Sequence, residues 1–424
     1  MERKTIAPGV NLCTHKTEQF KTSVVSLNII APLDKDATAR ALLIYLLSRT
    51  NKDYPEITLM NRRLASLYGA SLSAGVRKIG EAQVLSLTLL CVDDRFSLDG
   101  DSVLKDGITL LLDCLFKPDI TPDGFRRDNV EREKRLLTEK IESEKDDKRI
   151  YALSRMLSEM CCDEGYGIDR LGIAEDIPAI TGASLLSCWK KLIFSSQIQL
   201  NVTGSFNEEE ITSIIKDRFL PLSRKAEDIE EIRTEFIYEA YGSKTVTEKQ
   251  SIKQGKLVIG MRAGMTFEED NFPVIKLMTA IFGSGTFSKL FMNVREKMSL
   301  CYYCSARLID SKGIITVESG VETENAYKAL DAIRNELDAV RRGDFDDEAL
   351  SNAKLSLIDS YNSFGDSVIN TDLWATLQCN RAEFRAPEEY AELIKAVSRE
   401  EVIVAANMVT EDTVFILESE KEAE

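Results

Sequence analysis

The sequence has 424 residues and a formal net charge of −16, from 54 Lys and Arg against 70 Asp and Glu. This negative excess repels phosphate backbones and anionic lipids, so we expect neither nucleic acid nor a membrane as a partner. No stretch approaches the roughly 18 apolar residues of a membrane span, and the first residues lack a secretory signal pattern. We therefore expect a cytoplasmic, globular protein of two or more domains whose nine cysteines are thiols.

The first half of the chain predicts strands followed by helices. Alternating apolar residues indicate strands, and apolar spacings of three and four indicate helices that pack on a sheet. The predicted elements are a strand at 24–30, helices at 39–47 and 57–67, two strands around Gly80 within 71–92, helices along 103–115 and 150–160, a strand at 198–202, and a helix that is capped by Asn207, with Glu210 reaching back, and ends near Phe219.

The same order of elements recurs in the second half. Val25 aligns with Leu257 and Ala74 with Ala306, both at an offset of 232 residues. A constant offset over about 50 residues indicates two copies of one domain. The repeated elements are a strand at 257–262, helices at 272–281 and 288–297, and two strands within 302–321 that are broken at Lys312-Gly313. We predict domains at 1–220 and 244–424, joined by a polar, acidic linker at 221–243.

A glycine-rich turn in the second half carries a family resemblance. Residues 282–291 read Phe-Gly-Ser-Gly-Thr-Phe-Ser-Lys-Leu-Phe, and Arg295 of the following Arg-Glu-Lys precedes Tyr302 by seven residues. This pattern resembles the second domain of the pitrilysin, insulysin and mitochondrial processing peptidase family, and similar landmarks extend over nearly the whole chain. The resemblance implies an α+β fold of two tandem homologous domains, each a mainly antiparallel sheet covered by helices, as in LuxS and the processing peptidases.

The zinc motif of that family is degenerate in this chain. Family catalytic subunits carry His-x-x-Glu-His on the first helix, and the aligned positions are Arg40, Leu43 and Ile44. The family's third ligand aligns with Glu131, and the one histidine of the chain is His15. A single carboxylate does not hold zinc, and loss of the motif glutamate removes the general base that activates water. We expect no metal in this chain, zinc only in a partner subunit, and no hydrolysis by the chain alone.

The resemblance also implies what the chain does. Arg295 and Tyr302 match family residues that position the substrate backbone and donate hydrogen bonds to the polarised carbonyl. Some family members divide these parts between two subunits, so the resemblance implies the non-zinc subunit of a heterodimeric peptidase acting on peptides; a homodimer stays open. The strand 71–78 matches the sheet edge that binds extended peptides in the family.

The alternative to a subunit of a peptidase is a non-catalytic peptide- or protein-binding regulator. Paired bacterial homologues of this type are linked to peptide maturation and to modification of elongation factor P, and the resemblance does not choose between these pathways. A third hypothesis is an enzyme with Cys301 as nucleophile and His15 as base.

Three further motifs have simpler interpretations. Gly283-Ser-Gly285 follows a predicted helix and lacks the Gly-Lys-Ser/Thr ending, so we do not expect a phosphate cradle. Cys301-x-x-Cys304 has no second pair or histidine to complete a metal site. The glutamates between 131 and 144 are typical of the solvated face of a long helix.

Overall fold

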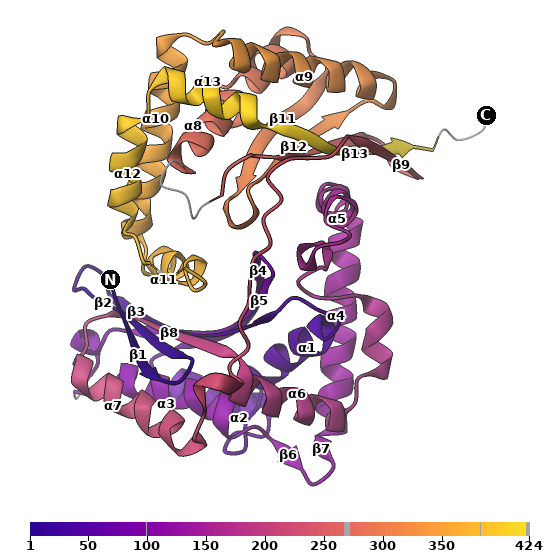
Figure 1. Cartoon of the computed structure of the whole chain (residues 1–424). Helices are drawn as coiled ribbons and strands as arrows, with labels where there is room; N and C mark the ends of the chain where they lie inside the picture. Colours follow the sequence, from indigo (N-terminus) through magenta and orange to yellow (C-terminus); the bar gives the residue numbers. More distant parts are fainter. Residues whose placement is uncertain (99, 267–271, 382, 421–424) are drawn as a thin grey trace. The chain divides into compact units, whose positions relative to one another are not determined.

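Two compact units, each built around one sheet, make up the computed structural model (Figure 1). The units comprise Met1–Glu142, Ile168–Arg233 and Phe364–Phe384 in unit 1, and Ser143–Gly167, Thr234–Ser363 and Arg385–Glu424 in unit 2. The residues that the structure describes are 1–98, 100–266, 272–381 and 383–420. Helices cover both sheets, so the expected α+β fold is confirmed. Among the described residues, no helix combines the length and the apolar composition needed to cross a membrane.

Unit 1 contains a six-stranded sheet in the order β1-β2-β8-β3-β5-β4, in which β2 and β8 run parallel and the other neighbours antiparallel. Its strands are β1 (Glu2–Ala7), β2 (Val10–Lys16), β3 (Thr22–Pro32), β4 (Ser71–Ile79), β5 (Ala82–Val92) and β8 (Gln197–Gly204), with a separate small hairpin of β6 (Ile120–Thr121) and β7 (Gly124–Phe125). Its helices are α1 (Ala37–Leu47), α2 (Ile57–Ser66), α3 (Val103–Phe116), α4 (Arg127–Asp146, whose last turn crosses into unit 2), α6 (Gly182–Ser195), α7 (Glu208–Phe219) and α11 (Val368–Leu377).

Unit 2 contains a five-stranded sheet in the order β11-β12-β10-β13-β9, in which β13 and β9 run parallel. Its strands are β9 (Lys244–Gln250), β10 (Gly255–Arg262), β11 (Cys301–Ile309), β12 (Ile314–Val321) and β13 (Thr410–Ser419). Its helices are α5 (Lys148–Met160), α8 (Phe272–Gly283), the π-helix η6 (Leu290–Lys297), α9 (Ala326–Arg342), α10 (Asp347–Asn362), α12 (Pro387–Ala396) and α13 (Arg399–Met408).

The strand order repeats between the two units. The run β4-β5-β3-β8-β2 of unit 1 has the same order as β11-β12-β10-β13-β9 of unit 2, and unit 1 adds β1 at one edge. Val25 and Leu257, which align in the sequence, lie on the equivalent strands β3 and β10. The constant sequence offset therefore identified equivalent strands.

One helix of each unit comes from a distant part of the chain. α11 follows most of unit 2 in sequence but packs on β3 and β8 of unit 1, and α5 precedes β8 but packs on β10 and β13 of unit 2. The compact units therefore cross the domain boundaries expected at 1–220 and 244–424. The expected linker begins inside unit 1, where Arg224 is buried and donates to the carbonyls of Pro8, Ile193 and Ser196.

Strand β3 shows why unit 1 has two different faces. Val25, Leu27 and Ile29 belong to the apolar core on the side of α1 and α3. Ser26 and Asn28 alternate with them and are 1% and 0% exposed, because α11 covers the opposite face. The period-two pattern predicts the strand correctly. Its polar side is nevertheless buried.

The corresponding face of unit 2 has an apolar centre with ion pairs around it, such as that of Arg149 on α5 with buried Glu318 on β12. α5 packs Met156 and Met160 against β10 so closely that a Cβ on Gly260 would lie 2.5 Å from both sulfur atoms. Glycine is needed here for this close approach. Just after α5, Glu164 accepts from Arg262 Nη2 at 2.8 Å and lies 2.6 Å from Lys312 Nζ. These three nearly fully buried charges fix the end of the α5 segment to the sheet.

Candidate functional site

The first helix places the degenerate zinc-motif positions inside unit 1. Leu43 and Ile44 are 0% and 1% exposed and belong to the apolar core. Arg40 is 1% exposed, and its guanidinium donates to the carbonyl of Pro32 at 2.6 Å and to Asp34 Oδ2 at 2.9 Å. Burial acts to raise the pKa of Asp34, but hydrogen bonds from Arg40 and the Asp36 amide outweigh it and lower that pKa.

These residues do not fit a zinc ion. A fixed cation, Arg40, stands at the first ligand position, and aliphatic side chains stand at the general-base position, Leu43, and at the second ligand position, Ile44. Within the described residues, no group of three or more His, Cys, Asp or Glu side chains is placed to hold a metal. Zinc sites need three or four such ligands.

The later helix does not present Glu131 as a buried ligand. The Glu131 side chain is 58% exposed and forms an ion pair of 3.1 Å with Lys134 on its own helix. The buried carboxylate of α4 is Glu133, 2% exposed, with Oε1 3.7 Å from Arg49 Nε and 3.4 Å from Arg132 Nε. The prediction that the glutamates of this helix are solvated is therefore wrong for Glu133, because this side chain points inward to Arg49, two residues after the end of α1.

Unit 2 carries Arg295 and Tyr302 where η6 leads into β11. The Tyr302 hydroxyl donates to Glu322 Oε1 at 3.2 Å, and the residue is 64% exposed. The Arg295 guanidinium lies 4.6 Å from the Phe291 ring centroid and 3.5 Å from the Glu296 carboxylate, and its side chain is 40% exposed. Both donors are accessible from solvent.

Tyr302 is the extra residue of a β-bulge. Cys301 pairs with Val321 and Tyr303 with Gly320, so Tyr302 is left out of the register. Bulges re-aim side chains and are frequent beside functional sites. A hydrogen bond from Cys304 lowers the pKa of Cys301 to about 7 against the effect of burial, and Ser319 and the charge of Arg295 contribute to the lowering. The charge of Arg295 thus acts on Cys301, the residue directly before Tyr302.

The remaining sequence motifs have structural roles. The Gly283-Ser-Gly285 turn ends α8, and a Cβ on Gly283 would lie 2.5 Å from the Ala306 Cβ of β11, so this glycine permits helix-to-strand contact. His15 lies on β2 of unit 1 and Cys301 on β11 of unit 2. All nine cysteines are free thiols, as expected.

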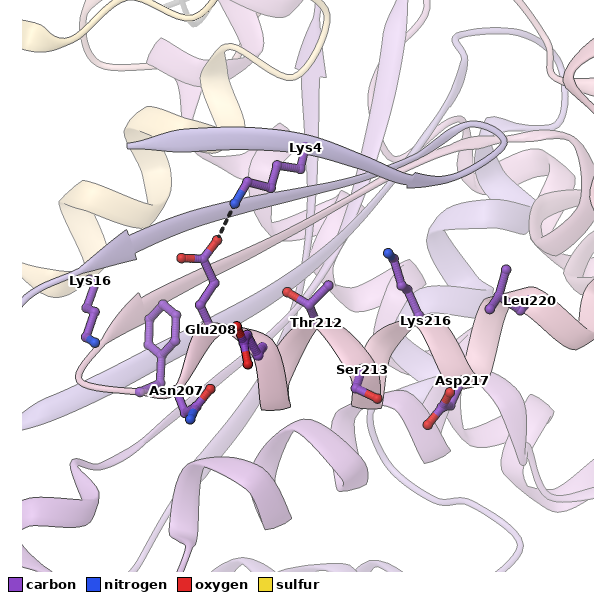
Figure 2. A pocket seen from close by; sticks show the side chains of 11 residues that line it. Lys4, Lys16, Asn207, Glu208, Thr212, Ser213, Lys216, Asp217 and Leu220 are labelled. Atoms are coloured by element: carbon purple, nitrogen blue, oxygen red, sulfur yellow. Dashed lines mark hydrogen bonds and ion pairs between the residues drawn. The ribbon is translucent and has the colours of Figure 1, made fainter.

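A groove of about 1010 Å³ lies beside α7 in unit 1 (Figure 2). Its charges are mixed: Lys4 pairs with Glu208 at 2.7 Å, and Lys216 and Asp217 line the same groove. Asn207 caps α7 by accepting from the Glu210 amide at 3.2 Å, but the Glu210 carboxylate pairs with Lys105 instead of reaching back. The expected reciprocal cap is therefore incomplete. The described lining of this groove brings together no set of catalytic groups.

The second hollow of interest adjoins the edge strand β4. It has a volume of about 290 Å³ and lies between β4, β5 and α11. Both polar and apolar side chains line it. The lining includes Asp372 of α11 and was not predicted from the sequence. Its lining residues are Asn28, Ser71, Ser73, Ala74, Gly75, Arg77, Ser86, Thr88, Leu90, Ile369, Asp372, Leu373 and Thr376.

Similar proteins identify the family. The family described as "Peptidase M16 inactive domain" matches residues 179–357. A Bacillus subtilis (strain 168) protein named "Probable inactive metalloprotease YmfF" is 31% identical over 98% of this chain and 97% of its own length. A protein of Rickettsia felis named "Uncharacterized zinc protease" is 20% identical over 67% of this chain and 68% of its own.

Solved structures agree on the fold. A conserved protein from Enterococcus faecalis V583 is 28% identical and matches with a TM-score of 0.92 over 100% of this chain and 99% of its own. A peptidase M16 inactive domain from Pseudomonas fluorescens, 16% identical, matches with a TM-score of 0.80 over 100% of this chain and 99% of its own. This chain belongs to the M16 peptidase family, as an inactive homologue in which Arg40, Leu43 and Ile44 replace the zinc motif.

Proposed function

We propose that this chain is the zinc-free subunit of a two-chain peptidase. It supplies Arg295 and Tyr302 to the active site of a homologous partner that carries His-x-x-Glu-His. One contrast supports this proposal: the zinc-motif positions are filled by buried Arg40 and core side chains, whereas Arg295 and Tyr302 keep accessible donors. Loss of one half of the site with retention of the other favours a division of labour.

The chemistry of the pair suits stabilisation of an oxyanion. When water attacks a peptide carbonyl, its oxygen gains negative charge, which a guanidinium and a phenol stabilise by donating hydrogen bonds. The Tyr302 hydroxyl donates to Glu322 in this structure, so it must leave Glu322 before it can donate to a substrate carbonyl. Such hydrogen bonds often form only in the substrate complex.

The test mixes the chain with a homologous zinc-motif subunit and measures peptide cleavage. Each protein alone is expected to be inactive or nearly so, and the mixture active. Removal of one oxyanion donor typically lowers kcat by about 10²–10³-fold, so Tyr302→Phe and Arg295→Ala should both lower the activity of the mixture. Tyr327→Phe and Arg307→Ala alter exposed residues of unit 2 and serve as controls. Unchanged activity in the first two variants would refute the proposal.

The second candidate is a non-catalytic peptide-binding protein, in peptide maturation, in elongation factor P modification or in another pathway. The observation that favours it is the free edge of β4 with a polar hollow beside it. An edge strand offers unpaired backbone groups to an extended peptide, and this requires no metal. Binding of peptide by the chain alone, with no cleavage in any mixture, would favour this function. We place either function in the cytoplasm, since nine free thiols suit a reducing compartment.

The molar mass of the particles in solution distinguishes a homodimer of this chain from a heterodimer with the partner. Light scattering of the chain alone and of the mixture should give a monomer and a 1:1 heterodimer. A stable homodimer that excludes the partner would contradict the two-chain peptidase.

A further inference from the structure

The hollow beside β4 contains a buried carboxylate, Asp372, on which the charge of Arg77 in the same lining acts without forming an ion pair. Asp372 is 7% exposed, and it forms no ion pair with any described residue. Its hydrogen bonds come from neutral side chains: Ser26 Oγ donates to Oδ1 at 2.6 Å, and Asn201 Nδ2 donates to the Asp372 backbone carbonyl at 3.4 Å. A buried charge of this kind is stabilised by a cation brought close to it.

The centre of the contact between α11 and the sheet is polar at Asp372, whereas the centre of the equivalent contact in unit 2 is apolar. In unit 2, α5 places methionines and other apolar side chains over the middle of the sheet, with ion pairs to Glu248 and Glu318 on either side. In unit 1, α11 contacts the sheet through a polar network that joins Asp372 and Thr376 to Ser26 and Asn201. Polar side chains at this contact bury less apolar surface than the methionines of unit 2 do. The hollow lies beside this polar contact.

The hollow has room and apolar walls for a long side chain. Leu90, Ile369 and Leu373 line it together with the hydroxyls and Asp372. Lysine and arginine place their methylenes on apolar surface while the charged end reaches a polar partner. A side chain that combines apolar methylene groups with a positive charge at its end matches this lining better than a purely apolar or an acidic side chain does.

The free edge of β4 brings a peptide to this hollow. Ser71, Ser73, Gly75 and Arg77 alternate along β4 and all line the hollow. A peptide strand paired with β4 places every second side chain over the same face. Gly75 has no atom within 4 Å of the position that a Cβ would take, so the entrance is open at this residue.

We propose that this hollow binds a lysine or arginine side chain of an extended peptide that pairs with the free edge of β4. The inference rests on the peptide binding proposed above and adds the class of side chain. Arg77 is exposed at the hollow and forms no ion pair within the described part of the chain. Its positive charge weakens the attraction for a second cation, so removing it should strengthen binding of a basic peptide.

The test measures fluorescence anisotropy of the full chain with two labelled peptides, Ser-Val-Ser-Lys-Ser-Val-Ser and its norleucine counterpart, at pH 8 and low salt. The lysine peptide should bind at least about tenfold more tightly. Asp372→Asn should abolish this preference, Arg77→Gln should increase it, and Asp366→Asn, an exposed acid just before α11, should leave it unchanged. Tryptophan fluorescence of Trp374 on α11 checks folding of each variant.

The outcomes separate two failures. Equal binding of both peptides, or a lysine preference that survives Asp372→Asn, would overturn the basic subsite and leave peptide binding intact. No binding of either peptide would overturn both the subsite and peptide binding at β4.

Discussion

The buried Asp372 makes the stability of unit 1 depend on pH. Burial raises the pKa of this carboxyl from 3.8 to about 6, although hydrogen bonds from Ser26 and Asn201 and the charge of Arg77 act in the opposite direction. The Cys13 thiol is the other titratable group that interacts with it, and its own pKa is raised to about 11, mainly by burial. Asp372 is therefore ionised at neutral pH in a place that favours the neutral form.

The size of the pKa shift gives the free energy by which protonation of Asp372 stabilises the folded state. The change from 3.8 to about 6 corresponds to about 3 kcal/mol at about 1.36 kcal/mol per unit. Because the pKa of Asp372 is higher in the folded state than in the unfolded state, protonation of Asp372 stabilises the folded state. This stabilisation is fully present below pH 3.8 and is lost as the pH rises through about 6. Lowering the pH from 8 to 5 should restore about 1.4 kcal/mol of it.

Asp372→Asn removes this titration. The oxygen of the new amide can still accept from Ser26, but its NH2 group faces the NH2 donor of Asn201, which costs about 1 kcal/mol. The variant should therefore be about 2 kcal/mol more stable than the wild type at pH 8. Urea unfolding followed by tryptophan fluorescence measures this in unit 1, where both Trp189 and Trp374 lie. The reasoning fails if the difference between variant and wild type is the same at pH 5 and pH 8. Asp366→Asn, at an exposed position, should show no pH-dependent difference.

Three further predictions concern unit 2. Glu164→Gln removes the carboxylate that pairs with buried Lys312 and one of the two carboxylates that pair with buried Arg262, and should lower the free energy of unfolding by about 3–5 kcal/mol, measured by urea unfolding monitored by circular dichroism. Gly260→Ala forces a Cβ against Met156 and Met160 and should destabilise by about 1–3 kcal/mol, with faster hydrogen exchange in α5. Cys301 should react with iodoacetamide with a midpoint near pH 7, and Arg295→Ala should raise that midpoint, as read by mass spectrometry.

Matched variants control these three experiments. Glu159→Gln disrupts partly exposed ion pairs with Arg155 and Lys244 and should cost less than about 1 kcal/mol; an equal loss in both variants would contradict the role of Glu164. Gly75→Ala places its Cβ in open space and should be tolerated, so equal destabilisation would refute the packing argument. Buried Cys114, with a pKa raised to about 12, should stay unlabelled, and a faster reaction there than at Cys301 would contradict the assignment.

Sequence patterns predicted the elements of the fold well but not the packing of two helices. Alternation located β3, and the offset that pairs Val25 with Leu257 identified equivalent strands, because periodicity reports which face of an element is buried. The same pattern could not reveal that α11 covers Ser26 and Asn28, because a polar residue under a polar helix and one facing water have the same local signature. Only the packing of segments far apart in sequence distinguishes them.

The candidate site was predictable where a motif carried it. The positions of Arg40, Leu43 and Ile44 on the first helix followed from the motif spacing, and the structure shows all three buried. Asp372 was missed because an acidic residue on a short helix carries no signal of its own; its significance comes from strands β3, β4 and β8. Glu133 was missed because its acidic neighbours made the whole helix face resemble a solvated surface.

We expect this chain to bind no zinc and to cleave no peptide by itself. Elemental analysis of the purified chain after exposure to zinc and desalting, together with a peptidase assay before and after chelation, tests this most directly. We predict zinc far below one ion per chain and no chelator-sensitive cleavage until a zinc-motif partner is added. One zinc per chain, with peptide cleavage that the chelator abolishes in the absence of any partner, would contradict it.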